Sequence, residues 1–138
     1  MRHIQVPVIA LLLVLTASCS STASQQPEAM YEKAAALTKL SRMVEVAVAY
    51  ETVPATAVDD ELLKAATKHD SSILDLFADY QLKATQGDRH SILVMCDSQG
   101  QEALLLDLGC TAKLDEHPWK TAQREQCIAP VNKVDDCH

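Results

Sequence analysis

Apolar positions between residues 28 and 51 recur at three- and four-residue steps, the period of an amphipathic helix. They are Met30, Ala34, Leu37, Leu40, Val44, Ala47 and Val48. The segment is also rich in alanine, a strong helix former. Residues 44–48 have valine at every second position, an alternation that would also suit a strand. Because Pro54 must end this element, we expect one helix whose apolar face lies on the core.

A second helical pattern runs from residue 58 to residue 85. Its apolar stripe comprises Leu62, Leu63, Ala66, Ile73, Leu76, Phe77, Tyr80 and Ala84. Acidic residues at 59–61 suit the positive end of a helix dipole, and Gly87 suits the residue that follows a helix. Asp and Ser at 70–72 favour helix ends over helix interiors, so we expect a bend or a break there. Together the two helices predict an antiparallel helical hairpin.

From residue 91 the apolar positions no longer recur with the period of a helix. Short apolar runs at 91–96 and 102–108 flank a turn that contains Gly100, which predicts a β-hairpin. Pro118 suits the first turn of a short helix. Residues 127–131 could then add an edge strand, since Pro130 is excluded from a central one. We therefore expect an α+β fold in which the helical hairpin packs on a small antiparallel sheet.

An apolar run at residues 4–15 follows Arg2 and has the length of an export signal. It is shorter than the roughly 20 apolar residues that a bilayer-spanning helix needs. The run ends in Thr16-Ala17-Ser18-Cys19, which resembles the lipobox of bacterial lipoproteins. The family commonly has Leu three residues before the cysteine, where this chain has Thr16. The resemblance implies a signal peptide at 1–18 and a lipidated Cys19.

Two other interpretations of this region stay open. An ordinary secretory signal could be cut after the small residues at 21–23, or the apolar run could remain as an uncleaved anchor. In the lipoprotein scheme, an Asp after the cysteine retains the protein at the inner membrane. Ser20 stands at that position, so the resemblance implies a bacterial cell-envelope protein, lipid-anchored at the outer membrane and facing the periplasm.

Composition limits the domain organisation and the partners. Residues 19–27 are small and polar after Cys19, and we expect a lipidated flexible tether with a reach of roughly 16 Å. Residues 28–138 are enough for one small domain. The formal charge of −7 becomes more negative once Arg2 is removed. This acidity argues against nucleic acid and against side-chain binding to an anionic membrane surface, so we expect membrane attachment through the lipid.

Four cysteines remain after Cys19, which predicts two disulfides in an exported chain. They are Cys96, Cys110, Cys127 and Cys137. In a regular hairpin Cys96 lies opposite Glu102, and Cys110 is then roughly 25 Å away at about 3.3 Å per residue. A disulfide needs Cα atoms within about 7 Å, so a Cys96–Cys110 bond is excluded.

Two pairings stay open, and the position of the third strand decides between them. If residues 127–131 pair with 102–108, the bonds are Cys110–Cys127 and Cys96–Cys137, which is the arrangement we favour. If they pair with 91–96 instead, the bonds are Cys96–Cys127 and Cys110–Cys137.

The C-terminal half carries a second resemblance, over about 25 residues. The pattern consists of Cys96, Asp97, Gly100, Ala103, Asp107, Gly109, Cys110 and Thr111, with Asp115 and Trp119 after it. It is similar to that of certain small proteobacterial lipoproteins, and this resemblance implies no particular activity.

Candidate catalytic and metal-binding residues are few. His69 lies near the apolar stripe of the second helix and could act as a base or a ligand, although a partly buried structural histidine is the ordinary explanation. His69, His90, His117 and His138 with the cysteines could suggest zinc. However, no Cys-x₂-Cys or His-x₃-His spacing is present and oxidised cysteines do not ligate, so we expect no metal and no cofactor.

Enzyme signatures are also missing from the sequence. There is no Gly-x-Ser-x-Gly motif for a hydrolase, and three glycines do not make a phosphate-binding loop. An enzyme would need His69, His117 and an acid to converge in one cleft. Trp119, the only tryptophan, is expected to cap the small core; the alternative is that it anchors a partner.

We therefore expect a non-catalytic accessory or assembly subunit that contacts an envelope protein partner. The alternative is a periplasmic module that binds a small ligand, and a hydrolytic enzyme is a third option. An apolar pocket between helices and sheet would favour the ligand-binding module. An exposed apolar patch around Trp119 or the first helix would favour the protein partner.

Overall fold

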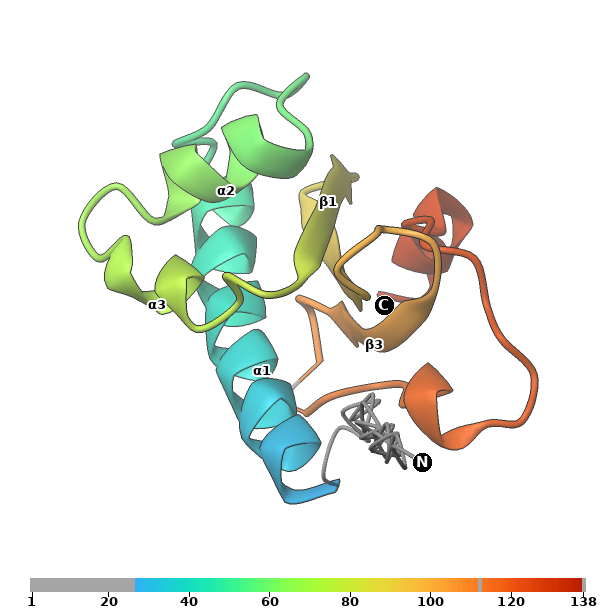
Figure 1. Ribbon diagram of the computed structural model, residues 1–138. Helices are drawn as coiled ribbons and strands as arrows, with labels where there is room; N and C mark the ends of the chain where they lie inside the picture. The colour runs from blue at the N-terminus through green and yellow to red at the C-terminus, as the bar shows by residue number, and fades with distance from the viewer. Residues whose placement is uncertain (1–26, 112, 138) are drawn as a thin grey trace, which may run out of the picture.

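The computed structural model describes residues 27–111 and 113–137 (Figure 1). The expected signal peptide, the lipidation at Cys19 and the tether up to residue 26 lie outside the described residues, as does His138. The elements in chain order are α1 (Pro27–Ala49), α2 (Asp59–Ala66), α3 (Ser72–Asp75), β1 (Gln81–Gly87), β2 (His90–Cys96), β3 (Ala103–Leu108), η1 (Pro118–Lys120) and η2 (Val131–Asp136). Within the described part of the chain, no helix combines the length and the apolar character that crossing a bilayer requires.

Helix α1 confirms the first predicted helix and excludes the strand alternative for 44–48. Its apolar stripe is buried against the sheet. After the last turn the Thr52 amide donates to the Ala47 carbonyl (2.9 Å) and the Glu51 amide donates to the Val48 carbonyl (3.0 Å). This is a Schellman-type end, which requires the left-handed backbone that Glu51 adopts (φ 54°).

The second predicted helix is only partly correct. The chain breaks between α2 and α3, as the polar residues at 70–72 predict, but residues 81–87 form strand β1 and not the end of a helix. Tyr80 and Ala84 are four residues apart, a spacing that suits one face of a helix and also one face of a strand. Pairing with β2 decides between them, through a two-residue turn at Asp88 and Arg89. Both turn residues have positive φ (47° and 69°).

The predicted hairpin of 91–96 and 102–108 is confirmed as β2 and β3. The sheet is antiparallel with the order β1-β2-β3, and a register shift lies between Met95 and Cys96. The predicted edge strand near 127–131 is wrong: the third strand is β1, which pairs with β2, and the described residues at 127–131 form no strand. Residues 126–129 touch the sheet edge at a single bridge, Glu102 to Gln126. The short helix predicted at Pro118 is present as the single 3₁₀ turn η1.

Both faces of the sheet are covered, which gives the domain three layers (Figure 1). One face of β2 and β3 packs under the helices, through residues such as Leu93, Met95 and Leu105. The opposite face, with Ile92, Val94, Cys96, Ala103, Leu106 and Leu108, packs against Cys127, Ala129 and Cys137 of the C-terminal segment. Two covered faces explain why β2 and β3 are continuous apolar runs, since alternation is expected only where one face meets water.

The disulfides are Cys96–Cys127 and Cys110–Cys137, with Cα–Cα distances of 5.7 and 5.8 Å. The favoured prediction, Cys110–Cys127 with Cys96–Cys137, is therefore wrong, and the alternative pairing is present. The error follows from the missing edge strand. The Cys127 amide donates to the Gln101 carbonyl (3.0 Å), at the β2–β3 turn and beside Cys96. From there the chain crosses the second face of the sheet and brings Cys137 to Cys110.

The end of α1 gives a stability prediction. Glycine adopts left-handed backbone without the steric cost that other residues carry. We expect Glu51→Gly to raise the free energy of unfolding by about 1 kcal/mol, measured by urea denaturation. Glu32→Gly, in the exposed interior of α1, is the control and should lower it by about 1 kcal/mol. A loss of stability in both variants would contradict the assigned helix end.

Candidate functional site

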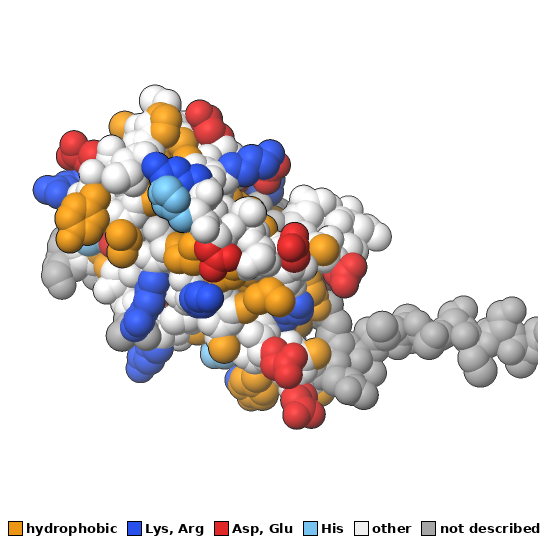
Figure 2. Space-filling model, turned by 90° about the vertical axis from the view of Figure 1, so that its left-hand side faces the viewer, with side chains coloured by type: hydrophobic (Ala, Val, Ile, Leu, Met, Phe, Trp, Pro, Cys, Tyr) orange, Lys and Arg blue, Asp and Glu red, His pale blue; other side chains and the backbone are white. Residues whose placement is uncertain are grey.

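The outward side of the helix layer carries a groove, which we call the α1–α2 groove. Its volume is about 450 Å³, and it is lined by Lys39, Arg42, Met43, Val46, Ala66 and His69. Met43 and Val46 lie off the buried stripe of α1, because that stripe faces the sheet. Val46 is 56% exposed. Hydrophobic side chains reach the surface beside basic side chains on this face of the molecule (Figure 2).

The rim of the α1–α2 groove consists of basic side chains, although the chain as a whole is acidic. Lys39 and Arg42 are exposed on α1, and His69 is exposed beyond the end of α2. Of the described residues that line the groove, none is acidic, whereas the whole chain has a formal charge of −7. The groove therefore joins an apolar floor to a positive border. Sequence reasoning missed it, because Lys39 and Arg42 look like ordinary solvated positions of a helix.

The two histidines considered for catalysis lie in different places. His69 borders the groove and is exposed, so the expectation of a partly buried structural histidine is wrong. His117 is half-buried beside Tyr31, with ring centroids 6.4 Å apart. Burial and, second, the Lys120 ammonium lower the pKa of His117. The described residues do not bring His69, His117 and an acid into one pocket.

Trp119 lies in an aromatic cluster with Tyr31, near the start of α1. It packs partly buried against the core, and its ring stands edge-on to Tyr31 with centroids 6.0 Å apart. The Lys120 ammonium lies 4.6 Å from the Tyr31 centroid and 5.4 Å from the Trp119 centroid, within the range of a cation–π contact. The Trp119 indole nitrogen is buried and has no hydrogen-bond partner among the residues that the structure describes. Trp119 thus caps the core, while Tyr31 is the exposed aromatic residue of the cluster.

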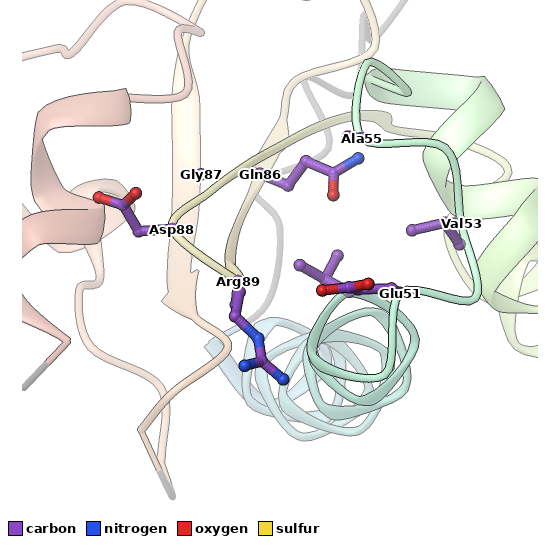
Figure 3. A pocket seen from close by; sticks show the side chains of 8 residues that line it. Glu51, Val53, Ala55, Gln86, Gly87, Asp88 and Arg89 are labelled. Atoms are coloured by element: carbon purple, nitrogen blue, oxygen red, sulfur yellow. The ribbon is translucent and has the colours of Figure 1, made fainter.

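A second cavity, the hairpin pocket, lies between the end of α1 and the β1–β2 turn (Figure 3). Its volume is about 340 Å³, and its lining is Val48, Glu51, Val53, Ala55, Gln86, Gly87, Asp88 and Arg89. Gln86 donates to the carbonyls of Pro54 (2.8 Å) and Ala57 (3.0 Å), and Arg89 donates to Ala49 (2.8 Å). These side chains thus close the ends of the pocket with hydrogen bonds to the loop and to α1.

Asp107 is a buried carboxyl group in an otherwise apolar strand. It lies under α1, where the Thr38 hydroxyl donates to its Oδ2 at 3.0 Å. Burial raises the pKa of Asp107 to about 6. The hydroxyls of Thr38 and Ser41 oppose this rise, and the charge of Asp115 adds to it. This role could not be predicted from the sequence, where Asp107 is one polar residue within the apolar run at 102–108.

Comparisons with protein-family models, with curated proteins and with solved structures found no match to this chain.

Asp107 gives a pH prediction. The folded state keeps the Asp107 proton up to about pH 6, whereas the usual pKa is 3.8, so the unfolded state releases the proton first. The stability from this group is full below about pH 4 and is lost as the pH rises through the folded pKa. Relative to Asp107→Asn, we expect the wild-type free energy of unfolding to fall by about 1–3 kcal/mol between about pH 4 and 7.

Urea denaturation of both proteins at each pH measures this difference. The contributions of the other titrating groups to the free energy of unfolding, that of His117 included, cancel in the difference because both proteins contain these groups. A difference that stays constant, or that grows in favour of the wild type as the pH rises, would show that Asp107 is not a buried group with a raised pKa.

Proposed function

We propose that this protein is a bacterial envelope lipoprotein, anchored through a lipid on Cys19, that works as a non-catalytic accessory or assembly subunit by contact with a protein partner. The signal-like run and the lipobox-like Thr16-Ala17-Ser18-Cys19 support the anchor. The α1–α2 groove supports the contact, and it is the single observation that carries the proposal.

The chemistry of the groove favours a protein partner with an acidic, amphipathic surface. Met43, Val46 and Ala66 offer apolar contact area, which gains free energy when water is excluded from it. Lys39, Arg42 and His69 border this area, so acidic side chains around an apolar patch would complement it. We place the contact here and not at Trp119, because Trp119 is already packed against the core.

The proposed anchor leaves this surface accessible. The expected tether joins the domain at Pro27, where α1 begins. Met43 lies sixteen residues further along the helix, about 24 Å at 1.5 Å per residue. A partner in the periplasm could thus approach the groove while the lipid stays in the membrane.

A small-ligand-binding module remains the second candidate, and the hairpin pocket is the observation that favours it. Its volume of about 340 Å³ falls within the size range of small-molecule sites. Glu51, Asp88 and Arg89, which line it, have positive φ, and backbone strain often gathers at binding sites. Here the helix end and the hairpin turn each require a backbone with positive φ, so the strain is explained by the fold. It is then no evidence for a ligand, and we therefore favour the protein partner over the small ligand.

The anchor is tested by the intact mass of the protein from native membranes, with and without reductant. We expect a chain that begins at Cys19 and carries a diacylglyceryl group and an N-acyl chain, with four protons fewer than the reduced form. A Cys19→Ser variant is the control and should be released from the membrane. An unlipidated chain that begins at Ser24 would contradict the proposal.

The contact surface is tested by photocrosslinking in living cells. A photoreactive residue replaces Val46 in one strain and Val131 in another; the two valines are 56% and 55% exposed and belong to opposite layers of the domain. We expect a discrete crosslinked product from position 46 that position 131 does not give. Lys39→Glu should lower its yield severalfold, because the partner is acidic. Equal products from both positions, or no effect of Lys39→Glu, would contradict the proposed surface.

A further inference from the structure

Three potential metal ligands meet at the end of the sheet far from the β2–β3 turn. His90 begins β2, Cys110 follows β3, and Cys137 lies near the C-terminus. A ring nitrogen of His90 and the sulfurs of the two cysteines all lie within 4.8 Å of one another. Cys110 is exposed and the other two are half-buried, so the group is open to solvent.

Glu45 of α1 holds the imidazole of His90 in place. Its Oε1 lies 2.5 Å from His90 Nδ1, and its Oε2 accepts hydrogen bonds from the Ser91 amide (2.8 Å) and hydroxyl (2.9 Å). With Nδ1 engaged, Nε2 is the nitrogen that remains for a metal ion. A carboxylate on the other ring nitrogen is the usual partner of a metal-binding histidine.

Gly109 is required for this close arrangement. A Cβ atom at this position would lie 2.3 Å from the Glu45 carboxylate and 2.4 Å from the Ser91 hydroxyl. Only glycine therefore lets the chain pass Glu45 closely enough to place Cys110 beside His90. The two cysteines, the histidine and its carboxylate thus form a packed cluster that a side chain at residue 109 would disrupt.

The two disulfides differ in accessibility. In the Cys96–Cys127 bond, Cys96 is fully buried in the sheet face that the C-terminal segment covers and Cys127 is half-buried, so neither sulfur belongs to an exposed residue. Cys110 is exposed, so a reductant can reach the Cys110–Cys137 bond. While that bond is intact neither sulfur is a thiolate, and thiolate is the form that binds metal.

We propose that reduction of Cys110–Cys137 by a dithiol creates a site for a divalent zinc-like metal ion, with both thiolates and His90 Nε2 as ligands and water in the fourth position. In the exchange, the dithiol gives two electrons and becomes a disulfide, the Cys110–Cys137 bond breaks, and the two sulfurs lose their protons when the metal binds. Tetrahedral zinc has bonds of about 2.0–2.3 Å, so its ligand atoms lie about 3.5–3.8 Å apart. The three ligand atoms now lie within 4.8 Å of one another, so this geometry is reached once the two sulfurs separate and the ligands adjust around the ion.

The proposal is tested with the full chain in detergent, with Cys19 blocked by its lipid or replaced by Ser. Limited reduction with a phosphine should add two protons at Cys110 and Cys137 and leave Cys96–Cys127 intact, as alkylation and peptide mapping would show. Titration with Co²⁺ should then give thiolate charge-transfer bands and the visible bands of a tetrahedral ion, at one equivalent. Zn²⁺ should displace the Co²⁺ and abolish these bands.

Matched variants assign the ligands. Glu45→Gln should weaken Zn²⁺ affinity by about 10- to 100-fold, and His90→Ala should weaken it further, whereas His69→Ala, at an exposed histidine elsewhere, should have no effect. Circular dichroism checks that each variant is folded. The inference is overturned if the reduced protein binds no metal. It is also overturned if the variant with both Cys110→Ser and Cys137→Ser binds Zn²⁺ as tightly as the reduced wild type does. The same holds if reduced His90→Ala binds Zn²⁺ with the affinity of the reduced wild type.

Discussion

The structure depends on the burial of the second face of the sheet. Strands β2 and β3 present apolar side chains on both sides, and the helices can cover only one of them. The C-terminal segment covers the other, although it has little regular structure of its own. Its place is held by Cys96–Cys127 near the β2–β3 turn and by Cys110–Cys137 at the far end. Closing loops of this size stabilises a fold by about 3–4 kcal/mol each on the entropic model.

Helix α1 joins this core to the surfaces that we consider functional. Its inner side packs on the sheet and covers Asp107, and its outer side exposes Val46 to the α1–α2 groove. Near its C-terminal end, Glu45 holds His90 beside the Cys110–Cys137 bond. The apolar groove and the histidine–cysteine cluster are therefore fixed by one rigid element, so a change in how α1 packs would alter both.

Periodicity and turn residues predicted α1, the break after α2 and the β2–β3 hairpin, since each has a local signal. They did not predict β1, because residues 80–84 fit a helix face as well as a strand, and Asp88-Arg89 lacks the glycine that usually marks a two-residue turn. The wrong disulfide pairing has a separate cause. The prediction placed residues 127–131 along β3 with Cys127 beside Cys110, whereas Cys127 lies at the β2–β3 turn, beside Gln101, and the chain then crosses the second face of the sheet. The groove and the Glu45–His90 pair arise from long-range packing, which no local pattern encodes.

The disulfide pairing tests the three-layer account most directly. Digestion of the unreduced protein with trypsin and a glutamate-specific protease cuts after Glu102 and so separates Cys96 from Cys110. Mass spectrometry should then find the Cys96 peptide joined to the Cys127 peptide, and the Cys110 peptide joined to the Cys137 peptide. Bonds between Cys110 and Cys127 and between Cys96 and Cys137 would contradict the account, because they place the C-terminal segment beside β3 and not across the face of the sheet.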